Sequence, residues 1–122
     1  MHLSTKESDL VRACLDWLAL HGILAWRANN TGIFDPTRRR FRSFHGLKGV
    51  ADVLGILPRR VRLADNAEAT FGSLLAVECK RPGQKPRPEQ AAFLDDVRAR
   101  GGLAFCVHSL KELEEALGPF LG

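Results

Sequence analysis

The chain has few cysteines and no ordered pattern of metal-binding side chains. Its three cysteines, Cys14, Cys79 and Cys106, are odd in number, lie far apart and each stand within an apolar stretch. This spacing disfavours a disulfide framework and a zinc site, and predicts buried thiols in a reducing compartment. The four histidines are scattered, and no H-E-x-x-H or C-x-x-C motif is present.

Long apolar runs and phosphate-binding loops are also missing. The first 26 residues are interrupted by charged side chains, so they predict neither a signal peptide nor a membrane span. The G-x-x-x-x-G-K-[ST] loop of nucleotide-binding proteins and the G-x-S-x-G elbow of acyl-transfer enzymes are both absent. We therefore expect a soluble, intracellular protein, such as one from the cytoplasm of a bacterial or phage-infected cell.

The composition is that of an ordinary globular protein with a basic excess. The 122 residues suffice for one hydrophobic core, which predicts a single domain over residues 1–122. The apolar fraction of 45% and the charged fraction of 26% are typical of globular chains. A formal net charge of +4 suits a polyanionic partner.

Two apolar runs each carry acidic residues. Residues 49–57 contain Asp52, and residues 70–80 end in Glu78 and Lys80. Because residues i and i+2 of a strand share a face, Glu78 and Lys80 should point the same way, and Asp52 joins them if the strands are neighbours. Two carboxylates beside an ammonium group suit metal-assisted phosphodiester hydrolysis. The alternative is a set of solvated charges at strand ends, which the cost of burying Asp52 in an apolar run disfavours.

The periodicity of the remaining chain predicts three helices and two further strands. A Ser4–Glu7 capping box opens a helix that ends near His21–Gly22. The later elements are strands at 23–27, 49–57 (closed by Pro58), 70–80 and 103–108, a turn at Asp65–Asn66, and helices at 88–100 and 109–117. A second capping box, Ser109–Glu112, opens the last of these helices. The resulting order is α-β-β-β-α-β-α, which predicts an α/β fold.

Basic side chains gather on both sides of the expected site. Residues 35–48 alternate basic with aromatic residues, and the loop at 81–87 is basic and rich in proline and glycine. Such segments suit contact with a phosphate backbone; a solvated loop and a nuclear-localisation signal are the alternatives. The residues expected to bind DNA are Arg38, Arg39, Arg40, Arg42, Lys48, Arg81, Lys85 and Arg87.

Four motifs, in this order, resemble the VRR-NUC (virus-type replication-repair nuclease) domain of the PD-(D/E)xK nuclease superfamily. They are K-G-V-A-D-V-L-G at 48–55, V-E-C-K-R-P-G at 77–83, P-E-Q at 88–90 and G-G-L-A at 101–104. Ala51 stands where the family usually has proline, which is not a ligand. The resemblance covers nearly the whole chain and implies a restriction-endonuclease-like fold with a mixed central sheet flanked by helices.

The resemblance also implies a role for each site residue. Asp52 and Glu78 would bind Mg²⁺ or Mn²⁺, with the carbonyl oxygen of Cys79 as a further ligand. Lys80 would support the attacking water, and Gln90 would place the phosphate or the water, unless it is an ordinary exposed helix residue. Glu7 matches a glutamate near the active site of the family, although it also suits helix capping.

The activity expected from the resemblance is that of a metal-dependent DNA endonuclease. Stand-alone members of this size resemble Holliday-junction resolvases that act as homodimers, and a C₂ dimer supplies the two active sites that paired nicks require. Larger relatives cut flaps or interstrand-crosslinked DNA, so flap cleavage is an alternative. Two further alternatives are a catalytically silent nucleic-acid-binding module and a small basic domain whose acids form internal salt bridges.

Overall fold

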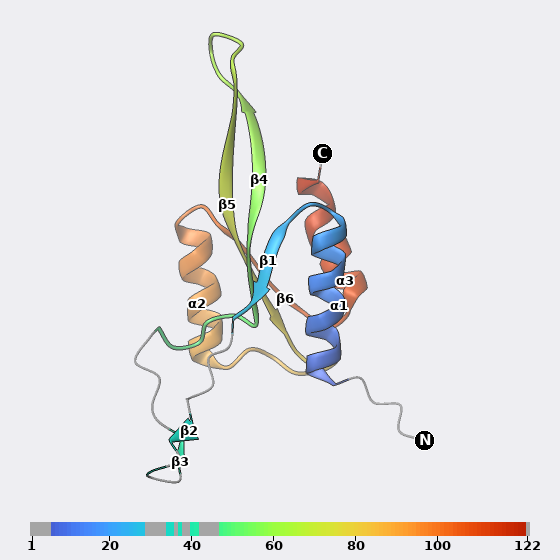
Figure 1. The fold of residues 1–122 in the computed structure, drawn as a ribbon, viewed down its shortest axis with the longest axis vertical. Helices are drawn as coiled ribbons and strands as arrows, with labels where there is room; N and C mark the ends of the chain where they lie inside the picture. The colour runs from blue at the N-terminus through green and yellow to red at the C-terminus, as the bar shows by residue number, and fades with distance from the viewer. Residues whose placement is uncertain (1–5, 29–33, 36, 38–39, 42–46, 122) are drawn as a thin grey trace.

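The computed structural model describes residues 6–28, 34–35, 37, 40–41 and 47–121. In this part of the chain the protein is mixed α/β, with a four-stranded mixed sheet and three α-helices (Figure 1). The elements are α1 (Glu7–Leu20), β1 (Leu24–Arg27), β2 (Phe34–Asp35), β3 (Arg40–Phe41), β4 (Val53–Arg62), β5 (Glu68–Cys79), α2 (Pro88–Ala99), β6 (Leu103–Val107), α3 (Leu110–Leu117) and the 3₁₀-helix η1 (Gly118–Phe120).

The sheet has the strand order β1-β4-β5-β6. The β1–β4 and β4–β5 pairs are antiparallel, and the β5–β6 pair is parallel. A parallel pair needs a crossover connection, and α2 provides it between β5 and β6. The expected mixed sheet flanked by helices is thus confirmed. The chain also forms a short antiparallel hairpin, β2–β3, between β1 and β4.

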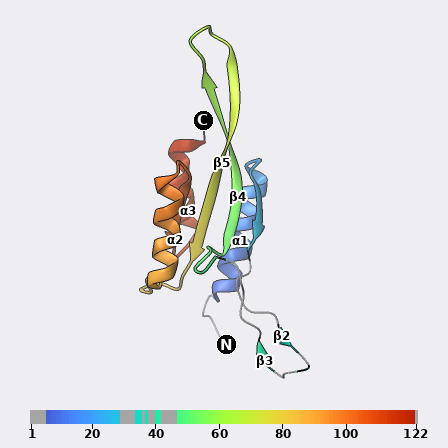
Figure 2. The ribbon, with the colours of Figure 1, turned by 90° about the vertical axis from the view of Figure 1, so that its left-hand side faces the viewer.

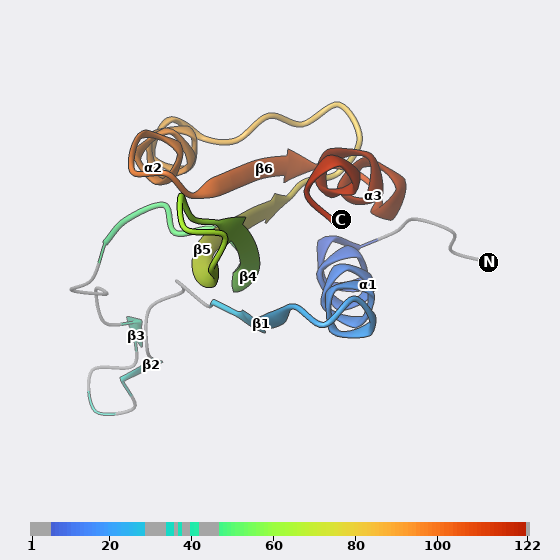
Figure 3. The ribbon, with the colours of Figure 1, turned by 90° about the horizontal axis from the view of Figure 1, so that it is seen from above.

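Helices cover both faces of the sheet. Helices α1 and α3 lie on one face and α2 lies on the other (Figures 1 and 3). The α1/α3 side holds the larger core, where Leu18 and Leu113 pack with Val77 of the sheet. On the α2 side the sheet presents small residues, Ala76 and Ala104, to the helix. No described helix has the length and apolar character needed to span a membrane.

Pro58 lies inside β4, opposite Gly72, and does not close the strand as expected. β1 pairs with β4 only as far as Ile56, so Pro58 occupies an edge position in the described structure. Proline is accepted at an edge because its missing N–H is not needed for pairing there. Residues 58–72 therefore continue as a two-stranded hairpin, the arm, which projects beyond the helices (Figures 1 and 2).

The turn expected at Asp65–Asn66 is confirmed at the tip of the arm. Asn66 has a positive φ of 65°, a conformation that asparagine tolerates better than most residues. The backbone N–H of Ala67 donates to Asp65 Oδ1 at 3.0 Å, as in an Asx-type turn. Local side-chain chemistry therefore sets the end of the arm.

The two expected capping boxes have different outcomes. Helix α1 begins at Glu7, with Lys6 at the N-cap and no side-chain cap, and Ser4 lies outside the described residues. In α3 the Ser109 hydroxyl accepts a hydrogen bond from the Glu112 N–H at 3.2 Å, as expected. The orphan N–H groups at the start of α1 are not satisfied by a side-chain cap at Lys6.

We expect Leu18→Ala to lower the free energy of unfolding by about 2–5 kcal/mol, because it leaves a cavity in the larger core. Leu20→Ala, on the same helix but at an 84% exposed position, should change it by less than about 0.5 kcal/mol. Urea unfolding followed by circular dichroism measures both. Equal losses would contradict the assigned orientation of α1.

Candidate active site

Two carboxylates meet where β4 begins and β5 ends. The antiparallel ladder pairs Val53 with Val77, and one further step places Asp52 opposite Glu78. Side chains directly opposite one another on such a pair share a face. Asp52 lies just before β4, not inside a strand as expected, and its Oδ2 accepts a hydrogen bond from the Cys79 backbone N–H at 2.8 Å.

The Glu78 carboxyl group is almost completely buried, with 2% exposure. Burial raises its pKa to about 9, with further contributions from a hydrogen bond to Asp52 and from the charge of Asp52, while Lys80 opposes the shift. One oxygen, Oε2, has no hydrogen-bond partner among the described residues. A buried carboxyl oxygen of this kind, beside a second carboxylate, is the donor chemistry that hard divalent cations prefer.

Lys80 and Glu7 lie beside the carboxylate pair. They line a cavity of about 430 Å³ between the first turn of α1, the residues after β5 and the start of α3. Lys80 lowers the pKa of Glu78 and Glu7 raises it, so both charges act on the buried acid. The Lys80 backbone N–H donates to the Val107 carbonyl at 3.0 Å, which extends the β5–β6 pairing by one residue and fixes the lysine backbone.

Gln90 is buried on the first turn of α2, which excludes the alternative of an ordinary exposed helix residue. Its Oε1 accepts a hydrogen bond from the N–H of Arg87, the N-cap residue, at 2.8 Å. Gly49 packs against the same turn with φ of +76°, and a Cβ atom there would lie 2.1 Å from the Glu89 carbonyl oxygen. Only glycine fits this contact, which holds the residues before Asp52 against α2. A role of Gln90 toward phosphate stays a prediction.

The Cys79 side chain points away from the carboxylates, because alternate residues of β5 face opposite sides of the sheet. It lies in the core with Cys14, and a hydrogen bond to Cys14 together with burial raises the pKa of the Cys79 thiol. A contribution of Cys79 to a metal site would therefore come from its backbone. Cys14 and Cys79 are buried free thiols as expected, whereas Cys106 is only partly buried.

The basic residues expected to bind DNA are only partly covered by the structure. Arg38, Arg39 and Arg42 lie outside the described residues, and Arg40 belongs to β3. The four others are exposed and flank the site: Lys48, Arg81, Lys85 and Arg87. Lys48 and Arg87 line a second cavity, of about 490 Å³, next to Gly49 and Gln90. Arg87 also lies 3.4 Å from Glu89 in an exposed ion pair.

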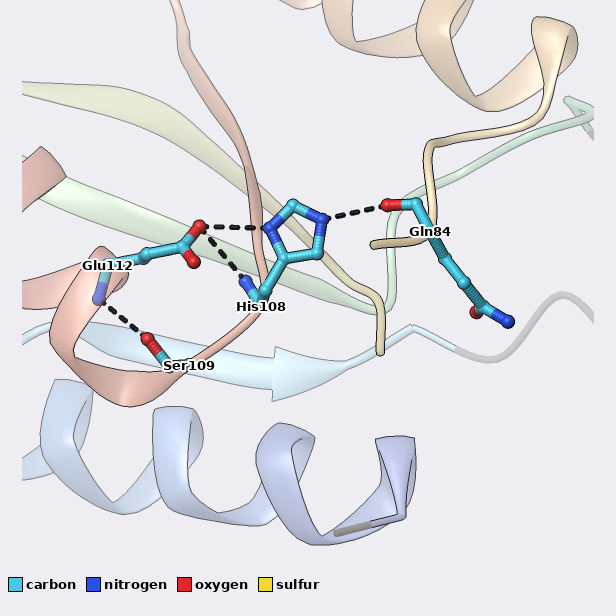
Figure 4. A network of polar contacts seen from close by, with 4 residues as sticks. All are labelled: Gln84, His108, Ser109 and Glu112. Carbon is cyan, nitrogen blue, oxygen red and sulfur yellow. Dashed lines mark hydrogen bonds and ion pairs between the residues drawn. The ribbon is translucent and has the colours of Figure 1, made fainter. Parts of the chain in front are cut away.

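His108, which the sequence did not single out, fastens the loop at 81–87 to α3. Its Nδ1 lies 3.0 Å from Glu112 Oε1, and its Nε2 lies 2.8 Å from the Gln84 carbonyl oxygen (Figure 4). The charged ring donates to both oxygens at once, whereas the neutral ring has one donor. The Glu112 bond and the Gln84 bond raise the pKa of His108, and the same ring lowers the pKa of Glu112.

Comparisons with known proteins identify no relative, so the function is inferred from the chemistry of the site. No protein-family model matches the chain, and no curated protein and no solved structure matches it either. Within the described residues, no three His, Cys, Asp or Glu side chains gather into a group that could hold a metal ion. The candidate ligand set is the Asp52–Glu78 carboxylate pair, which the backbone of Cys79 contacts through the N–H that donates to Asp52.

We expect Glu78→Gln to stabilise the metal-free protein at mildly alkaline pH. The pKa of Glu78 is about 9 in the folded chain against 4.5 for an ordinary glutamate, so its favourable contribution is complete below 4.5 and is lost as the pH rises towards 9. Glutamine has the shape of the protonated acid and does not ionise. Melting temperatures across this range should therefore fall less steeply in the variant than in the wild type. Glu114→Gln, on the exposed side of α3, is the control, and parallel slopes for Glu78→Gln and wild type would contradict the burial argument.

We expect the loop at 81–87 to loosen as the pH rises. The pKa of His108 is raised above 6.5, so its stabilising effect is complete below 6.5 and is lost as the pH passes through the folded value. At the acid end the effect is lost as the pH falls through the lowered pKa of Glu112, below 4.5. Hydrogen exchange of the loop amides, corrected for intrinsic rates, measures this. His108→Gln should abolish the pH dependence and His21→Gln should leave it unchanged.

Proposed function

We propose that the protein is a metal-dependent DNA endonuclease that hydrolyses phosphodiester bonds. The observation that carries this proposal is the carboxylate pair, in which Glu78 is buried beside Asp52 and keeps one oxygen without a partner among the described residues. Burying an uncompensated acid costs several kcal/mol, so a chain that only bound a polyanion, or only folded, would gain nothing from it. The resemblance of these residues to VRR-NUC motifs supports the same function and a restriction-endonuclease-like fold.

The carboxylate pair fits Mg²⁺ or Mn²⁺. Such cations take oxygen ligands and are commonly held by one or two carboxylates, together with waters and a substrate phosphate. Asp52 and Glu78 would hold the ion, with the Cys79 carbonyl as a further ligand. When bound, the cation screens charge on the phosphate and lowers the pKa of a water molecule. Ionisation of Glu78, which burial opposes, is then offset by the opposite charge.

Lys80 supplies a positive charge next to the Asp52–Glu78 pair. Its ammonium group orients the attacking water or stabilises the oxygens of the reacting phosphate. Glu7 assists from the first turn of α1, and the Gln90 side chain places the phosphate from the first turn of α2. Lys80 and Glu7 line one cavity and act on the same buried acid, which supports their joint role.

The electrostatic surroundings support a phosphate-containing substrate. Helices α1, α2 and α3 all begin at the end of the sheet where β5 and β6 stop (Figure 1). Helix N-termini carry partial positive charge and attract phosphate groups. The exposed residues Lys48, Arg81, Lys85 and Arg87 lie at the same end, in or next to the segments that line the two cavities.

The proposed substrate is branched DNA of the Holliday-junction type, cut by a homodimer. Paired nicks need two active sites, and a two-fold dimer presents them symmetrically. Flap cleavage is the alternative substrate within the same chemistry. The products from the two kinds of DNA differ, since a junction gives symmetric nicks in two strands and a flap gives one cut.

We expect Asp52→Asn and Lys80→Ala each to lower cleavage at least about 100-fold, because each removes a charge that acts in the transition state. Labelled four-way junction, flap and linear duplex DNA are incubated with wild type and variants in Mg²⁺ and in Mn²⁺. Asp16→Asn, an exposed position on α1, is the matched control and should retain full activity. Cleavage retained by Asp52→Asn would overturn the assignment of the site.

The same proteins test the metal independently of cleavage. A ligand that binds only the folded state raises the melting temperature, so Mn²⁺ should stabilise the wild type and Asp16→Asn, but not Asp52→Asn. Salt-sensitive DNA binding without cleavage of any substrate would instead indicate a catalytically silent binding module. No shift with metal and no DNA binding would indicate a structural acid pair.

A further inference from the structure

The arm, residues 58–72, has no partner for either of its long edges within the described chain. β1 ends opposite Ile56 of β4, and β6 begins opposite Leu75 of β5, so the five pairs from Pro58–Gly72 to Arg62–Glu68 stand alone (Figure 1). A two-stranded ribbon is at best marginally stable in water, and unpaired strand edges attract further chains. An arm of this length therefore calls for a covering partner.

The arm has one apolar face. Val61 pairs with Ala69, and residues two apart on a strand share a face, which places Val61, Leu63 and Phe71 on the same side. These three side chains are 39–56% exposed. Arg59 shares this side at the base of the arm, and the opposite face carries Arg60, Arg62, Glu68 and Thr70 by the same alternation. Exposed apolar side chains grouped in this way mark an interaction surface.

The charges of the arm favour a protein over DNA as its partner. Three arginines stand against Asp65 and Glu68, which leaves residues 58–72 with a net charge of only +1. Arg62 lies 3.7 Å from Glu68 in an ion pair, and the Arg59 guanidinium lies over the Phe120 ring at 5.3 Å. A ribbon that tracks a phosphate backbone needs uncommitted positive charge. Here most of that charge is already engaged within the chain.

The area of the arm is too small for two arms, packed only on each other, to form a stable dimer interface. Five residue pairs of about 3.4 Å each, with strands about 4.8 Å apart, give each face on the order of 200 Å². A standard-size interface buries roughly 800 Å² of each partner, and smaller ones are weak or transient. Packing each arm on the body of the partner doubles the area that each partner buries, to about 400 Å².

The body of this chain offers a matching surface. Four apolar side chains on the sheet face that carries α2 are 41–66% exposed. They are Leu24 and Trp26 of β1, Ile56 of β4 and Leu74 of β5, near the base of the arm. We call them the sheet patch. We propose that the arm is a dimerisation element whose apolar face packs on the sheet patch of a second copy of this chain. Two-fold symmetry then covers both arms and both patches at once.

This inference rests on the homodimer of the proposed function and names its surface, but it does not depend on cleavage. Sedimentation equilibrium without DNA or metal, over a hundredfold range of micromolar concentration, measures it. Wild type and Asp52→Asn should both dimerise, so loss of cleavage with an intact dimer separates the two proposals. A wild type that stays monomeric over the whole range would overturn the inference.

Charged substitutions test the two surfaces. Phe71→Glu on the arm and Trp26→Glu on the sheet patch should each raise the dimer dissociation constant at least about 100-fold, because every dimer carries the buried carboxylate twice. Thr70→Glu, next to Phe71 but on the opposite face, is the matched control and should leave it unchanged. Leu63→Glu repeats the arm test should Phe71→Glu fold poorly, with thermal melts as the check on folding.

Mixing the two variants tests which surfaces meet. A mixed dimer of Phe71→Glu and Trp26→Glu keeps one intact arm on one intact sheet patch, whereas each variant alone keeps neither contact. We therefore expect dimer to reappear on mixing. Its absence on mixing would overturn the packing of the arm on the sheet patch, and unchanged dimerisation of Phe71→Glu with weakened binding of duplex DNA would show a nucleic-acid ribbon instead.

Discussion

The hydrogen bond from the Cys79 backbone N–H to Asp52 Oδ2 holds the start of β4 against the end of β5. It forms one step beyond the last regular pair of the β4–β5 ladder, where the Ala28 N–H also donates to the Asp52 carbonyl oxygen at 2.8 Å. Because of the bond from Cys79, the Asp52 side chain stays beside Glu78 and does not turn towards water. The tight contact of Gly49 with the first turn of α2 supports the same segment from the other side. The proposed chemistry depends on this short junction between two strands.

The packing around the junction works against the ionisation of its own acid. Small residues on the α2 side, Ala76 and Ala104, let the helix approach the sheet closely, which keeps water away from Glu78. The larger core on the other face, around Leu18 and Val77, supplies stability that does not involve the site. A well-packed scaffold that carries one unfavourably buried acid fits the general trade between stability and activity at functional sites.

Much of the site could be predicted because it follows from alternation along strands. The pairing of Asp52 with Glu78 required only that two apolar runs be neighbours, and the helix that starts at Pro88 carried its own local signal. Three features escaped prediction because they depend on distant partners. β4 continues through Pro58 because β1 ends early, His108 gains its role from Gln84 in another loop, and Gln90 is covered by the segment at Gly49 that packs on its helical turn. For His108, the available sequence signal was its position directly before Ser109, the N-cap of α3.

Both proposed metal-binding carboxylates lie at the base of the hairpin formed by β4 and β5. Asp52 directly precedes β4 and Glu78 is the second-last residue of β5, so the arm can change without disturbing them. Adding one residue to each strand near the Asp65–Asn66 turn would lengthen the arm and preserve the register below it, whereas a single added residue would shift the faces of one strand or form a bulge. The reach of the arm can thus evolve in paired steps, independently of the chemistry at its base. Selection for partner binding can therefore act on the arm, while selection for the reaction acts on the base of the same hairpin.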